Sequence, residues 1–176
     1  MEFPSRHFLL SAVFMIMISH LMAGNAPSKL VEDVCNQAKE LGTKFADCVD
    51  GLLLDPTSAT ANLTTLAHIS IQLGISNATD TQTYIENMLK SNPGLQKPLK
   101  SCLSWYEAII ASFKSALIEL EEDVPSANYD VKMVGDYVQG CEDELARDKV
   151  QIPSVTTRDN YAKLYSNIAF VITEHL

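Results

Sequence analysis

The stretch LKSCLSWYEAIIASFKSALIELEEDV, residues 99–124, decides the fold of this 176-residue chain. Its apolar side chains recur at alternating steps of four and three residues, which is the spacing of one face of a long α-helix with bundle-type packing. The positions are Leu99, Leu103, Tyr106, Ile110, Phe113, Leu117, Leu120 and Val124, and Cys102, Trp105 and Ile109 widen the same face.

Three other long segments have an amphipathic helical pattern and no stretch has a clear strand pattern: residues 59–90, 128–147 and 157–176. The first ends at Asn92-Pro93-Gly94, a strong stop signal, and Pro153 separates the other two. A shorter pair, residues 30–41 and 45–54, precedes them and is closed by Asp55-Pro56. The sequence therefore predicts an all-α fold, with an N-terminal helical hairpin in residues 27–56 and an up-down four-helix bundle in residues 57–176.

Residues 1–26 have the pattern of a secretory signal peptide. Arg6 and His7 precede an uncharged run, and small residues follow near residues 24–26, where we expect cleavage. The apolar part of the run, Leu9–Ile18, is about half of the ~20 residues that a spanning helix needs. We therefore expect a secreted protein with one domain beyond the leader.

All four cysteines lie beyond the expected leader, at Cys35, Cys48, Cys102 and Cys141. An even number in a secreted chain indicates disulfides, and none of the four is spaced closely enough for a zinc site. The midpoint of the first two falls at Gly42, and the midpoint of the last two falls within residues 121–125. Antiparallel helices joined at such breakers bring symmetric positions face to face, so we predict the bridges Cys35–Cys48 and Cys102–Cys141.

Two Asn-x-Thr sequons, at Asn62 and Asn77, predict N-glycosylation. Both fall on the predicted helix over residues 59–90. If they carry glycans, that part of the helix faces solvent and does not form a tight protein interface.

The formal net charge of −9 and the sequence pI near 4.8 make nucleic acid a poor partner, because binding to phosphate backbones depends on Lys and Arg. De-esterified pectin, also a polyanion, is disfavoured for the same reason. Acidic side chains concentrate at the end of the third predicted long element and in the next one: Glu119, Glu121, Glu122, Asp123, Asp130, Asp136, Glu142, Asp143 and Glu144. They form either an ordinary solvated face or a docking edge for a partner with a basic rim.

The chain offers almost no catalytic groups. His7 and His20 belong to the expected leader, which leaves His68 and His175, and both fit structural or surface roles. No nucleophile elbow, zinc-binding His pair, phosphate-binding loop or dinucleotide-binding turn occurs. We therefore predict neither an enzyme nor a bound metal or cofactor.

Three fragments, in order with the four cysteines, resemble the plant invertase and pectin methylesterase inhibitor family over essentially the whole chain beyond the leader. They are Asp55-Pro-Thr-Ser-Ala59, Leu99-Lys-Ser-Cys-Leu-Ser-Trp-Tyr-Glu-Ala108, and Ala127-Asn-Tyr-Asp130 followed by Cys141-Glu-Asp143. The resemblance implies a four-helix bundle with a projecting hairpin and the same two bridges. It also implies a stoichiometric inhibitor of a plant cell-wall enzyme, in the apoplast or the vacuole. Residues 126–145 and 155–176 look most like the plane-tree pollen allergen subgroup, whose members are labelled as invertase inhibitors.

Departures from the family pattern indicate which enzyme the protein inhibits. Invertase inhibitors of the best-understood type carry a Pro-Lys-Phe motif before the fourth cysteine, and here the corresponding stretch is Ala127-Asn128-Tyr129. The Tyr129-Asp130 pattern is more like that of pectin methylesterase inhibitors, so we favour pectin methylesterase and keep acid invertase as the alternative. Gly140 and Leu145 replace the usual Thr and Phe around the fourth cysteine. A small-ligand carrier and a structural wall protein are further alternatives.

The segment 121–130 is expected to be an exposed loop between two stapled helices and the target-binding surface. Its candidate residues are Glu121, Glu122, Asp123, Tyr129 and Asp130. Tyr129 has two possible placements, as an exposed interface anchor or as an aromatic packed into the core at the start of a helix.

Overall fold

Helices make up nearly all of residues 26–176, the part of the chain that the computed structural model describes. The expected signal peptide therefore lies outside the described residues, apart from Ala26. The long helices are α4 (Leu63–Ser91), α5 (Gln96–Glu122), α6 (Val124–Arg147) and α7 (Pro153–Thr173), preceded by α2 (Lys29–Ala38) and α3 (Phe45–Leu52). Short 3₁₀ turns are η1 (Lys39–Leu41), η2 (Pro56–Thr60) and η3 (Pro93–Leu95). No strand occurs within residues 26–176, so the predicted all-α fold is confirmed.

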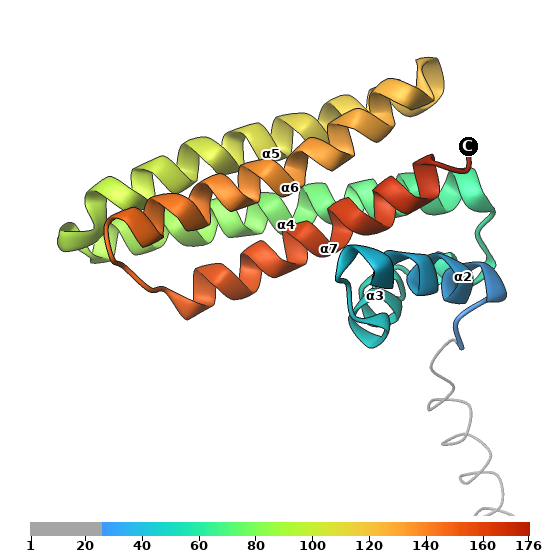
Figure 1. The fold of residues 1–176 in the computed structure, drawn as a ribbon, viewed down its shortest axis with the longest axis horizontal. Helices are drawn as coiled ribbons and strands as arrows, with labels where there is room; N and C mark the ends of the chain where they lie inside the picture. The colour runs from blue at the N-terminus through green and yellow to red at the C-terminus, as the bar shows by residue number, and fades with distance from the viewer. Residues whose placement is uncertain (1–25) are drawn as a thin grey trace, which may run out of the picture.

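The four long helices alternate in direction along the bundle (Figure 1). Helices α5 and α6 form one side of the bundle, α4 and α7 pack against them, and the α2–α3 hairpin lies against α7 on the opposite side. This is the predicted up-down bundle with an N-terminal hairpin extension. No helix in the described range is long and apolar enough to cross a membrane.

The helix boundaries follow from local capping, and one of them corrects a prediction. Helix α4 begins at Leu63 rather than residue 59, because the Oδ1 of Asn62 accepts the Thr65 N–H at 2.8 Å and so caps the helix. Asp55 caps the preceding η2 turn by accepting the Thr57 N–H at 2.9 Å. Gly42, with φ of 84°, ends the first hairpin helix in a left-handed conformation that glycine adopts without strain.

The expected exposed loop over residues 121–130 is wrong. Helix α5 ends at Glu122 and α6 begins at Val124, so only Asp123 separates them. Pro125 lies in the first turn of α6, where a missing N–H breaks no helical hydrogen bond. Pro153 likewise begins α7, four residues before the predicted start at Thr157. In both places proline starts a helix instead of interrupting one.

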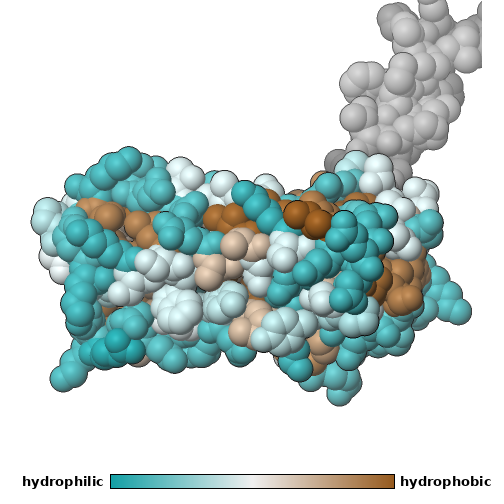
Figure 2. Space-filling model, turned by 90° about the horizontal axis from the view of Figure 1, so that it is seen from above, coloured by the Kyte–Doolittle hydropathy of each residue, from teal (hydrophilic) through white to brown (hydrophobic). Residues whose placement is uncertain are grey.

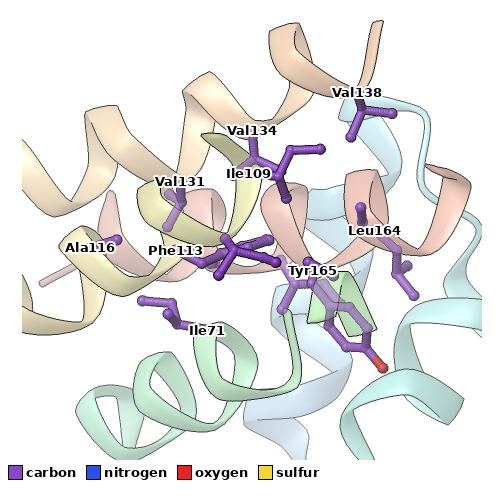
Figure 3. Packing of buried hydrophobic residues seen from close by; sticks show 14 of the residues in the cluster. Ile71, Ile109, Phe113, Ala116, Val131, Val134, Val138, Leu164 and Tyr165 are labelled. Carbon is purple, nitrogen blue, oxygen red and sulfur yellow. The ribbon is translucent and has the colours of Figure 1, made fainter. Parts of the chain in front are cut away.

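The core runs the length of the bundle, with Phe113 near its centre (Figure 3). Phe113 is fully buried and lies among Ile71 of α4 and Val131 and Val134 of α6. Its ring requires a glycine opposite, because a Cβ at Gly74 would lie 2.7 Å from the Phe113 Cζ. The predicted stripe is mostly buried, since Leu99, Tyr106, Ile110, Phe113 and Leu120 are all in the core.

The two disulfides join the cysteine pairs that the sequence predicted. Cys35–Cys48 links α2 to α3 with a Cα–Cα distance of 5.6 Å, and Cys102–Cys141 links α5 to α6 with a Cα–Cα distance of 4.5 Å. All four sulfur-bearing residues are fully buried. The bridges therefore hold together the two antiparallel pairs, α2 with α3 and α5 with α6.

Candidate functional site

The turn between α5 and α6 gathers four of the five predicted target-binding residues on the surface. Glu121, Glu122 and Asp123 are exposed at the end of α5, and Tyr129 is 61% exposed on the second turn of α6. The alternative placement of Tyr129 in the core is therefore wrong. Asp130 differs from the others, because it is half-buried.

Sequence reasoning missed Ile118, which is 64% exposed one turn before the end of α5. Ile118 directly follows the stripe residue Leu117 and so falls outside the four-and-three pattern. That off-stripe position is the signal that could have identified it as an exposed apolar side chain. Exposed single apolar residues are common on proteins, but this one shares the acidic end of the α5–α6 pair with Tyr129.

Asp130 is held by α5 and is not a free docking group. Its backbone oxygen accepts a hydrogen bond from the Ser112 Oγ at 3.0 Å. The Glu119 carboxyl faces it, and burial, together with the negative charges of Asp130 and Asp123, raises the pKa of Glu119 above its ordinary value. The Glu119 Oε2 is buried and has no hydrogen-bond partner. The Ser112–Asp130 hydrogen bond joins α5 to α6 behind Tyr129.

Both histidines beyond the leader have structural partners. The His68 Nε2 lies 2.8 Å from the Glu121 Oε1, which ties α4 to the end of α5. The His175 Nε2 lies 2.7 Å from the Gln37 Oε1 and ties the C-terminus to α2. Within residues 26–176, no group of three or more His, Cys, Asp or Glu side chains is placed to hold a metal ion.

The residues beside Tyr129 are committed to packing. Ala127 is fully buried. Asn128 donates from its Nδ2 to the Phe170 carbonyl at 3.1 Å and to the Thr173 Oγ1 at 2.8 Å, both on α7. Of the segment Ala127-Asn128-Tyr129, only the tyrosine projects toward solvent.

The outer side of the α5–α6 pair carries a half-buried aromatic stack. The rings of Trp105 and Tyr137 lie 6.1 Å apart between centroids with an interplanar angle of 25°. A Cβ at Gly140 would lie 2.5 Å from the Trp105 ring, which explains why glycine occupies this position. Figure 2 views the molecule from the α5 and α6 side and shows apolar surface in separate patches among hydrophilic side chains.

A second carboxyl pair lies inside the bundle, between α6 and α7. The Tyr106 OH donates to the Asp159 Oδ1 at 2.5 Å, and Asp159 is only 1% exposed. The Asp159 Oδ2 and the Glu142 Oε1 are buried without other partners. Burial, and then the hydrogen bond with the Glu142 carboxyl, raise the pKa of Asp159 to about 8. A pKa near 8 means that Asp159 is mostly protonated at neutral pH.

The two sequons differ in exposure. Asn62 is exposed at the start of α4, whereas Asn77 is half-buried in the middle of that helix and its Oδ1 has no hydrogen-bond partner. The Thr79 Oγ1 of the second sequon donates to the Ile75 carbonyl at 2.7 Å. Glycosylation at both sites stays a prediction, with Asn62 the more accessible site.

Comparison with known proteins gives a consistent set of relatives. Residues 29–170 match the family model described as plant invertase/pectin methylesterase inhibitor. A Platanus acerifolia protein named "Putative invertase inhibitor" is 30% identical over 171 residues, covering 93% of this chain and 94% of that protein. Two Arabidopsis thaliana proteins follow: "Cell wall / vacuolar inhibitor of fructosidase 2" is 28% identical over 89% of this chain and 88% of its own, and "Pectinesterase inhibitor 2" is 24% identical over 91% and 90%.

Solved structures share the fold. A crystal structure of a mutant form of an Arabidopsis pectin methylesterase inhibitor superposes with a TM-score of 0.70 at 24% identity, covering 81% of this chain and 94% of that one. A second crystal structure of a pectin methylesterase inhibitor, from Arabidopsis thaliana, gives a TM-score of 0.62 at 23% identity, covering 86% and 98%.

Proposed function

This chain belongs to the plant invertase/pectin methylesterase inhibitor family, and we propose on that premise that its target is a pectin methylesterase. The chain is an enzyme inhibitor and not itself an enzyme, and its partner is an enzyme protein. Which enzyme it inhibits depends on the surface that it presents at the end of the α5–α6 pair. We further propose that it acts in the cell wall, with the vacuole as the alternative compartment.

The observation that carries the proposal is the placement of the side chains of Ala127, Asn128 and Tyr129. The segment contains no lysine or phenylalanine. Ala127 is buried and Asn128 is hydrogen-bonded to α7, so neither residue projects as an inserting side chain. The exposed group is a tyrosine on a rigid helix, flanked by acids. Such a surface suits coverage of an open cleft better than insertion of a charged side chain into a deep active site.

The proposed mechanism is steric occlusion without a covalent step. Tyr129 and Ile118 supply two exposed apolar anchors, and Glu122 and Asp123 supply an acidic rim for a basic partner. The bridge Cys102–Cys141 and the hydrogen bond from the Ser112 Oγ to the Asp130 carbonyl hold α5 against α6 before binding. Preorganisation of this kind reduces the entropy that is lost on association.

Acid invertase is the second candidate, and the relatives favour it. The Platanus acerifolia relative, at 30% identity, is named as an invertase inhibitor, and one Arabidopsis relative is named as an inhibitor of fructosidase. If this chain inhibits invertase, it does so without the Lys-Phe pair.

A titration of the oxidised protein against a pectin methylesterase and an acid invertase, side by side, tests the proposal. We expect stoichiometric inhibition of the esterase and at least tenfold weaker inhibition of the invertase. Tyr129→Ala should weaken the inhibition, while Leu54→Ala, which removes a side chain 70% exposed on the N-terminal hairpin, should not. Stronger inhibition of the invertase than of the esterase would contradict the proposed target. Equal effects of Tyr129→Ala and Leu54→Ala would contradict the proposed target-binding surface.

A further inference from the structure

A groove of about 410 Å³ separates the N-terminal hairpin from α7. One wall is the turn between α2 and α3, and the other is a face of α7 that includes Tyr161 and Asn160. Helices α5 and α6 do not line this groove, so it is distinct from the proposed target-binding surface. Its volume lies in the range of small-molecule sites.

The groove combines exposed apolar groups with polar ones. Leu41 on the hairpin and Tyr161 on α7 are 43% and 47% exposed, and they leave large apolar surfaces open to solvent. The amide of Asn160 is exposed beside Tyr161. An aromatic ring next to an amide suits a ligand with an apolar face and hydroxyl groups at its edge.

The lining is basic although the protein as a whole is acidic. Lys44 and Lys163 both line the groove, against a single carboxylate, Asp47. Neither lysine forms an ion pair with a carboxylate of the described residues. The Lys163 Nζ donates at 3.2 Å to the neutral Oε1 of Gln139 on α6, a helix that does not line the groove, so pairing with a ligand in the groove would replace this hydrogen bond. Among the residues that line the groove, these two lysines face one carboxylate, and charges further away than about 8–10 Å are screened at physiological salt.

The groove is preformed by the fold. The Asn167 Nδ2 donates to the Leu41 carbonyl at 3.2 Å and to the Thr43 Oγ1 at 3.0 Å, which joins α7 to the hairpin turn. The bridge Cys35–Cys48 closes the hairpin behind that turn. A ligand would therefore lose little affinity to ordering of the walls.

We propose that this groove binds a short stretch of uronic-acid polysaccharide and holds the inhibitor on acidic wall polymer. The C–H face of a sugar ring packs on Tyr161 and Leu41, its hydroxyls bond to Asn160, and the carboxylates of neighbouring sugars pair with Lys44 and Lys163. This assignment revises the expectation from net charge that such a polymer is disfavoured. It does not depend on which enzyme the protein inhibits.

Calorimetric titration at ~0.1 M salt with a short oligomer of unesterified uronic acid tests the site, and the fully methyl-esterified oligomer of the same length is the comparison. The unesterified oligomer should bind at least tenfold more tightly, because esterification removes the charges and keeps the ring faces. The double variant Lys44→Gln/Lys163→Gln should lose at least tenfold in affinity. Tyr161→Ala should lose a similar amount, and Tyr161→Phe should retain binding.

The matched control is Lys100→Gln/Lys114→Gln, which removes two exposed lysines from α5 and should bind the oligomer like the unmodified protein. Melting temperatures of all variants show whether each one is folded. No binding, equal binding of the two oligomers, or equal losses in the two double-lysine variants would overturn the proposal. Inhibition of the target enzyme by Tyr161→Ala, measured on the same samples, should be unchanged, so failure of the groove and failure of the inhibitory surface are told apart.

Discussion

Replacement of the buried Asp159 by asparagine should remove much of the pH dependence of this protein's stability. Burial and the neighbouring Glu142 carboxyl raise the pKa of Asp159 from its ordinary value of 3.8 to about 8. The folded protein therefore holds a proton that the unfolded chain releases at mildly acidic pH. The stability contributed by this carboxyl is complete below the ordinary pKa and is lost as the pH rises through the folded pKa.

The size of the effect follows from the number of protons. Between about pH 4 and pH 8 the folded state binds one proton more at this site, and each pH unit then costs about 1.4 kcal/mol of unfolding free energy. For a domain of ~150 residues, about 1 kcal/mol shifts the melting temperature by roughly 2–4 °C. The melting temperature should therefore fall by roughly 3–6 °C per pH unit across this window.

Other carboxyls act in different windows or to a smaller extent. The Thr57 hydroxyl, and then the Thr57 N–H, lower the pKa of Asp55, so the stability from Asp55 is present above its ordinary pKa of 3.8 and is lost as the pH falls below it. Glu119, with its raised pKa, acts in the same direction as Asp159 but at the surface, so Glu119→Gln serves as the control.

Thermal unfolding by circular dichroism from pH 5 to pH 8, on the unmodified protein and both variants, measures these slopes. In Asp159→Asn the amide oxygen can still accept from the Tyr106 OH and the amide nitrogen can donate to Glu142, so the fold should persist with a much flatter profile. Glu119→Gln should keep most of the slope. A melting temperature that is constant or rises between pH 5 and pH 8, or a full slope in Asp159→Asn, would refute the reasoning.

Three further predictions concern the interface, the bridges and helix packing. Tyr129→Ala should weaken target inhibition at least tenfold, about 1.4 kcal/mol, with no change in melting temperature because its side chain is 61% exposed; an unchanged inhibition constant would move the interface elsewhere. Cys102→Ser should destabilise more than Cys35→Ser, by about 1 kcal/mol on loop entropy alone, because the bridged residues are 39 apart rather than 13; equal melting temperatures would contradict this. Gly74→Ala should cost about 1–3 kcal/mol, because its Cβ would lie 2.7 Å from a ring atom. Gly135→Ala, with nothing within 4 Å of the new Cβ, should gain about 0.5–1 kcal/mol in chemical denaturation, and a loss there would show that the packing is misjudged.

The helical periodicity predicted most of the core because every long helix has one face against the bundle axis. The disulfide pairing was also accessible from sequence, since antiparallel neighbours place residues symmetric about a turn opposite each other. The helix boundaries near Pro125 and Pro153 could not be predicted from the sequence, because proline is both a helix breaker and a favoured first-turn residue. Only the tertiary packing of the following segment decides between these two roles.

The carboxyl pairs could not be predicted from the sequence, for a different reason. Glu142 and Asp130 appeared in sequence as members of one acidic run, either solvated or available for docking. In the structure each faces another carboxyl, at Asp159 and Glu119 respectively. Periodicity places a residue on a face of its own helix, but it does not say which side chain of another helix lies opposite. Together with burial, those neighbours raise the pKa values of Asp159 and Glu119.

The departure from the family pattern at Gly140 has a structural explanation in its contact with Trp105. Sequence comparison within the family marked Gly140 as a departure from threonine, and Trp105 was assigned to the core face of its helix. The structure places Trp105 half-buried between α5 and α6, with its ring over the space that a Cβ at residue 140 would occupy, at 2.5 Å. A threonine at this position would displace the indole, so a larger residue fits at position 140 only if the Trp105 ring moves. The ring also stacks on Tyr137. This contact lies beside the Cys102–Cys141 bridge, at the end of the α5–α6 pair that is far from the Asp123 turn, so it affects the packing of the two helices at the bridge and not the proposed target-binding surface.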